Sequence, residues 1–130
     1  MFRNPFRVTD LWILLGFIFV YTAVFDSKLD VGGDNAGYFI LGQSIYSGQG
    51  YTDLHLPGAS KANHFPPGYP AIISLFMMFS DDFTFLKVIN GFFFFLSLLM
   101  LHRIFERMTT SKSLAWMALA FTLVNGHLLR

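Results

Sequence analysis

Residues 83–101 read FTFLKVINGFFFFLSLLML, an apolar run in which Lys87 and Asn90 are the strongly polar side chains. A helix needs about 20 predominantly apolar residues to cross the hydrocarbon core of a bilayer. With a few flanking residues, this run therefore predicts a membrane-spanning helix over residues 83–105.

The composition of the whole chain also indicates a membrane protein. Of the 130 residues, 54% are hydrophobic and 13% are charged, whereas a soluble domain carries about 25% charged residues. The net charge of +1 provides no basic balance of the kind that indicates nucleic-acid binding. The chain contains no cysteine, which excludes disulfides, thiol catalysis and cysteine-based metal sites.

Two more apolar segments flank the first run and predict two more spans, over residues 9–25 and 113–130. Polar or small residues interrupt the second of these near its end, at Asn125, Gly126 and His127. The expected fold class is all-α and polytopic, with three transmembrane helices in a single membrane domain, residues 1–130.

The predicted span nearest the N-terminus, residues 9–25, is expected to remain on the protein as an anchor. Arg3 and Arg7 precede an apolar run, as in a secretory signal peptide. Cleavage, however, needs small residues in an A-x-A-like pattern. The nearest candidate, Tyr21-Thr22-Ala23, has a bulky tyrosine at the first small position.

The distribution of charge predicts the orientation of the spans. Basic residues precede the first span and follow the second, and most of the acidic residues lie between the two. The basic residues are Arg3, Arg7, Arg103, Arg107 and Lys112. Because an excess of Lys and Arg marks the cytoplasmic side, we expect a plasma (inner) membrane protein with a cytoplasmic N-terminus and an external loop over residues 26–82.

One surface helix is expected late in this loop. Residues 71–79 are apolar but too few to span, and the charge parity disfavours an extra crossing. They follow HFPPGYP, residues 64–70, in which Pro66 and Pro67 predict an extended elbow. Pro70 suits the first turn of a helix. We therefore expect a short helix over residues 71–79 along the membrane surface.

A second surface helix is expected earlier in the loop, over residues 34–47. Tyr38, Leu41 and Ile45 recur there at helical spacing. Asp34 stands where the N-cap of the helix is expected. The apolar stripe predicts an amphipathic helix that lies on the outer membrane surface.

The order of these features resembles the GT-C class of integral-membrane glycosyltransferases, in particular the bacterial lipid A aminoarabinose transferases and protein mannosyltransferase-like enzymes. The resemblance is carried by five motifs along the chain. They are Asp34, Tyr38, Gly48-Gln49-Gly50-Tyr51, Pro66-Pro67-Gly68-Tyr69-Pro70, and Lys87 with Asn90.

The resemblance implies an inverting transfer of a sugar from a polyprenyl-phosphate donor to a hydroxyl or similar acceptor on the outer face of the membrane. Members of this class have many more spans, so the chain resembles the N-terminal part of such an enzyme. We therefore expect it to need the missing C-terminal spans for activity. Membrane lipid is an expected partner, and nucleic acid is not.

The resemblance assigns roles to five residues. Asp34 is the candidate catalytic base, or alternatively a ligand of a divalent metal ion, which is the one candidate cofactor. Lys61 and His64 are candidate cations for the departing phosphate. Tyr38 and Lys87 are further candidates for substrate binding.

Each of these residues also has a plain structural alternative. Asp34 can act as a helix cap, and Lys87 can extend toward the membrane interface. A metal site built from Asp53, His55 and His64 matches no compact ligand spacing. Two functions from other classes stay open, namely a non-catalytic membrane module that binds lipid or anchors a partner, and part of a transporter. A transporter would place its polar residues near the bilayer midplane.

Overall fold

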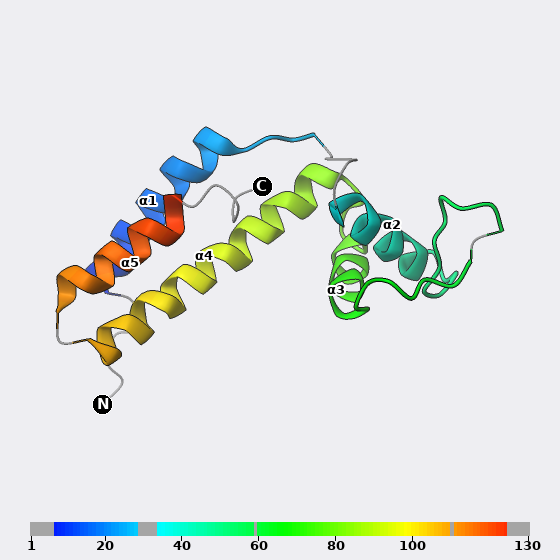
Figure 1. The fold of residues 1–130 in the computed structure, drawn as a ribbon. Coiled ribbons are helices and arrows are strands. Elements are labelled where there is room, and N and C mark those ends of the chain that lie inside the picture. The colour runs from blue at the N-terminus through cyan, green and yellow to red at the C-terminus, as the bar shows by residue number, and fades with distance from the viewer. Residues whose placement is uncertain (1–6, 29–33, 59, 110, 125–130) are drawn as a thin grey trace, which may run out of the picture. The chain divides into compact units, whose positions relative to one another are not determined.

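The computed structural model describes residues 7–28, 34–58, 60–109 and 111–124 (Figure 1). This part of the chain forms five α-helices and no strand. The helices are α1 (Val8–Val24), α2 (Asp34–Tyr46), α3 (Gly68–Met77), α4 (Phe83–Met108) and α5 (Lys112–Val124). The all-α fold class is thus confirmed.

The helices belong to two compact units. Unit 1 comprises Met1–Asp26 and Asn90–Arg130, and unit 2 comprises Ser27–Ile89. Helix α4 is continuous through the boundary, so its first turns belong to unit 2 and the remainder to unit 1.

Helix α4 is the one described helix that is long and apolar enough to cross a membrane. Its 26 residues give a length of about 39 Å at 1.5 Å per residue, against a hydrocarbon core of about 30 Å. Helices α1 and α5 are apolar but shorter, with 17 and 13 residues. The end of the third predicted span, residues 125–130, lies outside the described residues.

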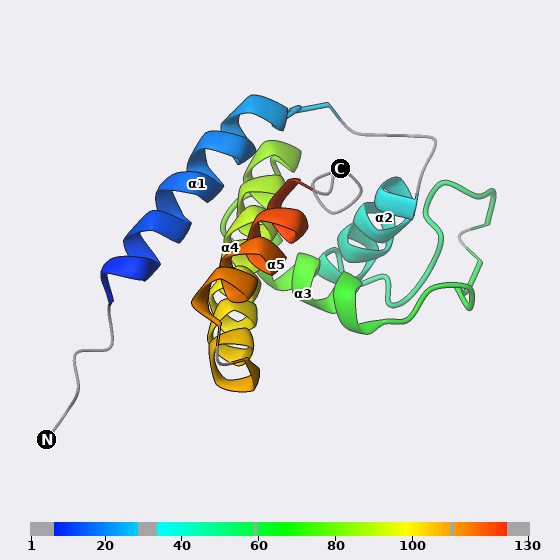
Figure 2. The ribbon, with the colours of Figure 1, turned by 60° about the vertical axis from the view of Figure 1, so that its left-hand side comes forward.

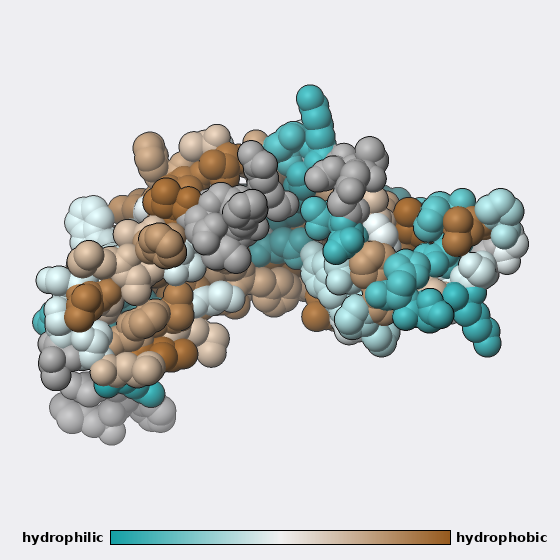
Figure 3. Space-filling model, in the orientation of Figure 1, coloured by the Kyte–Doolittle hydropathy of each residue, from teal (hydrophilic) through white to brown (hydrophobic). Residues whose placement is uncertain are grey.

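Aliphatic and aromatic side chains from α1, α4 and α5 form the core of unit 1. Ile13 and Phe17 of α1 pack with Leu98 of α4 and Leu119 of α5. Apolar side chains also cover much of the outside of these helices, as the brown surface over α1 and α5 shows (Figure 3). Such a surface is typical of helices that contact lipid or further helices.

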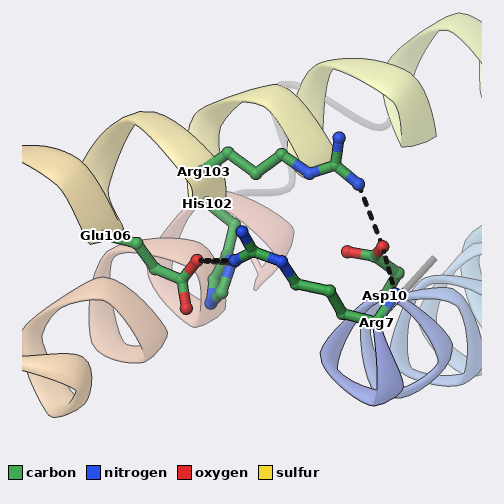
Figure 4. A network of polar contacts seen from close by, with 5 residues as sticks. All are labelled: Arg7, Asp10, His102, Arg103 and Glu106. Atoms are coloured by element: carbon green, nitrogen blue, oxygen red, sulfur yellow. Dashed lines mark hydrogen bonds and ion pairs between the residues drawn. The ribbon is translucent and has the colours of Figure 1, made fainter. Parts of the chain in front are cut away.

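A polar network ties the start of α1 to the end of α4 (Figure 4). Asp10 is buried, and its Oδ2 accepts hydrogen bonds from the Arg7 backbone N–H at 3.0 Å and from the Arg103 guanidinium at 2.9 Å. Arg7 also pairs with Glu106 at 2.9 Å. Since α1 begins where α4 ends, these two helices run antiparallel within unit 1.

In unit 2, α2 packs against α3. Leu41 of α2 is fully buried, and Tyr38 packs against the cluster formed by Ile73, Met77 and Leu86. The apolar stripe predicted on α2 is real, but it faces α3. The expectation that this stripe lies on the membrane is therefore wrong for Leu41, which is fully buried, and the half-buried Tyr38 packs against the same cluster.

The elbow before α3 also differs from the prediction. Helix α3 begins at Gly68, and Pro67 has helical backbone angles of φ −74° and ψ −13° instead of extended ones. Pro70 is accommodated because the N–H groups of a first helical turn have no partner within the helix. Helix α3 keeps an exposed apolar face made of Ile72, Leu75 and Phe79 just beyond its end.

Gly42 permits the close approach of α2 to α3, and Gly42→Ala tests this contact. A Cβ at this position would lie 2.5 Å from Ile73 Cγ2 and 2.9 Å from Ile73 Cβ. The Cβ of Ile73 cannot rotate away, so the helices must separate. We expect the free energy of unfolding to fall by about 1–3 kcal/mol, as for other overpacked cores.

The matched control is Gly16→Ala, where the new Cβ would meet its nearest neighbour, Leu123 Cδ2, at an ordinary 3.8 Å. Helix propensity should then keep or raise stability, by up to about 1 kcal/mol. Thermal unfolding in detergent, followed by circular dichroism, measures both variants. Equal melting temperatures for Gly42→Ala and the unmodified protein would contradict the proposed packing.

Candidate functional site

The loop between α2 and α3 extends beyond the end of α2 (Figure 2), and hydrogen bonds hold its first residues to that helix. Gly48 lies two residues after the end of α2 at Tyr46; its φ of +76° suits glycine, and its N–H donates to the Ile45 carbonyl. The buried Ser44 hydroxyl donates to the Gly50 carbonyl at 2.9 Å and lies 2.6 Å from the Thr52 hydroxyl. These bonds fix where the loop leaves the helix.

The two arms of the loop also pair with each other. Thr52 and Lys61 form an isolated antiparallel bridge. The Asp53 N–H donates to the Ser60 carbonyl at 2.9 Å, and the Ala62 N–H donates to the Tyr51 carbonyl at 3.0 Å. The loop is thus a defined structure that can hold side chains in place.

An aromatic cluster joins the loop to α2 and α3. The Phe65 ring lies 4.6 Å from the Tyr38 ring and 4.5 Å from the His64 ring, between centroids. Tyr38 also meets Tyr69 of α3 edge-on at 5.1 Å. Gly37 leaves room for this arrangement, because a Cβ there would lie 2.6 Å from Phe65 Cε2.

Tyr51 holds the same cluster from the other arm. Its hydroxyl donates to the Phe65 carbonyl at 2.8 Å. Burial, reinforced by Tyr38 and by the negative charge of Asp53, raises the pKa of Tyr51 above its usual value of 10.0. The phenol is therefore protonated, and able to donate, throughout the neutral pH range.

Asp34 is the first residue of α2 and is exposed. Asp34 was predicted to be the N-cap of this helix, and in the structure it is already the first helical residue. Asp34 precedes Gly37 and Tyr38 by one helical turn, and residues three and four apart share a face of a helix. Since Gly37 and Tyr38 both contact Phe65, Asp34 lies on the side of α2 that carries the aromatic cluster.

The structure brings His64 into contact with the aromatic cluster, places Lys61 in the bridge between the loop arms and gives Lys87 other contacts. Lys61 is exposed in the bridge beside Asp53. Lys87 donates to the Lys28 carbonyl at 2.7 Å and lies over the Phe83 ring at 5.1 Å. These contacts hold the Lys87 ammonium group near the start of α4.

The sequence grouped Asp53 with His55 and His64 only as a metal set of unsuitable spacing, and it did not predict that Asp53 is buried. Asp53 is 3% exposed, and its Oδ2 lies 3.7 Å from His64 Nδ1. The sequence places these residues on opposite arms of a loop, so only the pairing of the arms brings them together. The local sequence around Asp53 and around His64 does not predict that their side chains lie close together.

The described residues around Asp34 supply no ready-made set of metal ligands. Within the described ranges, no group of three or more His, Asp or Glu side chains lies close enough to hold a metal ion. Asp34 itself is exposed, and the nearest acid–base pair, Asp53 with His64, supplies two ligands. We therefore derive no step through a metal.

Comparisons of the chain with protein-family models, curated proteins and solved structures give no match. The candidate site thus rests on the geometry of unit 2 and on the order of motifs along the chain.

Proposed function

We propose that this chain is the N-terminal part of an inverting, lipid-phosphate-dependent glycosyltransferase of the GT-C class. It would move a sugar from a polyprenyl-phosphate donor to a hydroxyl or similar acceptor on the outer face of the membrane. One observation carries this proposal: Asp34 lies on the same side of α2 as the aromatic cluster, and that cluster is continuous with His64 and its loop. An acid and a cation thus share one compact unit.

The chemistry assigns one role to each of these groups. The acceptor oxygen forms a bond to the anomeric carbon of the sugar, and the bond from that carbon to the phosphate oxygen breaks. The electron pair leaves with the lipid phosphate, and the acceptor proton passes to the Asp34 carboxylate. Lys61 and His64 stabilise the negative charge that grows on the phosphate. The aromatic faces of Tyr38 and Phe65 offer an apolar wall to the sugar.

The proposal places the chain in the plasma (inner) membrane as a polytopic protein with a cytoplasmic N-terminus. Helix α4 supplies one span by its length, and α1 and α5 supply the others with flanking residues. The pairing of Arg7 with Glu106 and of Asp10 with Arg103 supports a common side for the start of α1 and the end of α4. Both ends are basic, which favours the cytoplasmic side.

The test uses the protein encoded by the full reading frame that contains these residues, purified and reconstituted in proteoliposomes. A polyprenyl-phosphate sugar, labelled in the sugar, is supplied as donor, and the release of polyprenyl monophosphate is measured. We expect release that depends on the protein and on an added acceptor. No release with any of a panel of hydroxyl acceptors would contradict the transferase function.

A lipid-binding module without catalysis is the second candidate. It is favoured by the exposed apolar face at α3, where Ile72, Leu75 and Phe79 are 46%, 56% and 78% exposed. Such a face can insert among lipid chains at the interface. In the same proteoliposomes this candidate predicts binding of the lipid phosphate with no release of product.

A further inference from the structure

The Asp53 carboxylate is in an unusual position for a charged group. It is 3% exposed, and its Oδ1 has no hydrogen-bond partner among the described residues. Burial of a carboxylate without hydrogen bonds is costly unless an opposite charge compensates for it. The nearest group able to carry that charge is His64, whose Nδ1 lies 3.7 Å from Asp53 Oδ2.

The geometry of His64 leaves its other nitrogen for a ligand. The side chain is 50% exposed, and its ring packs against Phe65 at 4.5 Å between centroids. The distance of 3.7 Å between His64 Nδ1 and Asp53 Oδ2 is too long for a hydrogen bond, and the contact is an ion pair when the imidazole is protonated. When an imidazole is protonated, both nitrogens donate hydrogen bonds. Nδ1 then faces the buried carboxylate, and Nε2 lies on the opposite side of the ring.

We propose that Asp53 is a positioning residue that holds His64 so that its Nε2 donates a hydrogen bond to a phosphate monoester, with Lys61 as a second cation. The fixed loop supports this role, since the Thr52–Lys61 bridge and the Tyr51–Phe65 hydrogen bond hold both arms. The inference rests on the proposed function for the identity of the ligand as a lipid phosphate. Lys61 and a protonated His64 are exposed donors of one loop, and such donors suit an anionic group such as a phosphate.

Binding measurements on the protein encoded by the full reading frame, in phosphatidylcholine nanodiscs, test this inference. The probe is a polyprenyl monophosphate, and competition by inorganic phosphate shows whether the lipid chain or the phosphate alone is recognised. We expect His64→Gln and Asp53→Asn each to weaken binding about tenfold, as for loss of a charge-assisted hydrogen bond. His55→Gln, a change at an exposed histidine of the same loop, should leave the affinity unchanged.

A double-mutant cycle separates positioning from a merely structural role. If Asp53 acts through His64, adding Asp53→Asn to His64→Gln causes no further loss of affinity. A full additional loss in that background, an Asp53→Asn affinity equal to that of the unmodified protein, or no binding of either phosphate by the unmodified protein would each overturn the inference.

A second measurement covers the case in which Asp53→Asn fails to fold. In the unmodified protein, the imidazole ¹⁵N resonances of His64 are followed during addition of the lipid phosphate. We expect a larger shift at Nε2 than at Nδ1, and the reverse order would overturn the inference. If the binding and resonance results contradict the role of Asp53 and His64 while transfer still depends on Asp34, the proposed function stands. If those results support the role of Asp53 and His64 while Asp34→Asn transfers sugar normally, only the catalytic role of Asp34 is refuted.

Discussion

Asp34→Asn is expected to lower the rate of sugar transfer by about 10²-fold or more, as for loss of a general base. Asparagine keeps the size of the side chain and removes its negative charge and basicity. The loss of a favourable charge at the start of α2 costs only about 0.3–1 kcal/mol, so folding should survive. Donor affinity should change less than turnover, because the missing interaction belongs mainly to the transition state.

The measurement is the rate of sugar transfer by the protein that the full reading frame encodes, divided by the amount of that protein folded in the membrane. Asn35→Ala is the matched control, since Asn35 is the exposed neighbour of Asp34 on the same turn of α2. Transfer by Asp34→Asn at the rate of this control would show that Asp34 only stabilises the helix terminus.

Thiol labelling of intact cells is expected to give an all-or-none pattern for the topology. Because the chain has no cysteine of its own, single cysteines introduced at Ser60 and Ser80 can be read without background. Both should react with an impermeant reagent, since the basic residues that flank the two spans predict an external location for residues 26–82. A cysteine at Ser113, beside Lys112 at the start of α5, should react only after the membrane is opened.

The pair of sites brackets α3, which the proposal places at the outer surface. Labelling at Ser60 with protection of Ser80 would mean that α3 crosses the membrane. That result would mean that α4 has the opposite orientation to the predicted one. The basic residues after it would then not mark the cytoplasmic side.

The sequence alone determined the helical class and the positions of the helices. The apolar run that begins at Phe83 contains no helix-breaking proline, and it forms α4 as predicted, with an end three residues later than expected. The glycine pair after Ser47 ended α2 near the predicted residue. These features depend on neighbouring residues only, because periodicity and turn chemistry act within a few positions of the chain. The start of α3 was less predictable, since Pro67 tolerates both extended and helical angles.

The tertiary structure decided which surfaces meet and which charges are buried. The stripe of Tyr38 and Leu41 suits water–lipid interfaces and helix contacts equally, and only the closeness of Gly42 to Ile73 shows that it serves the contact with α3. Asp53 reads as an ordinary loop carboxylate until the bridge between Thr52 and Lys61 brings the two arms together and removes it from water. Burial and charge pairing arise between residues far apart in the chain, so the local pattern that fixes a helix carries no information about them.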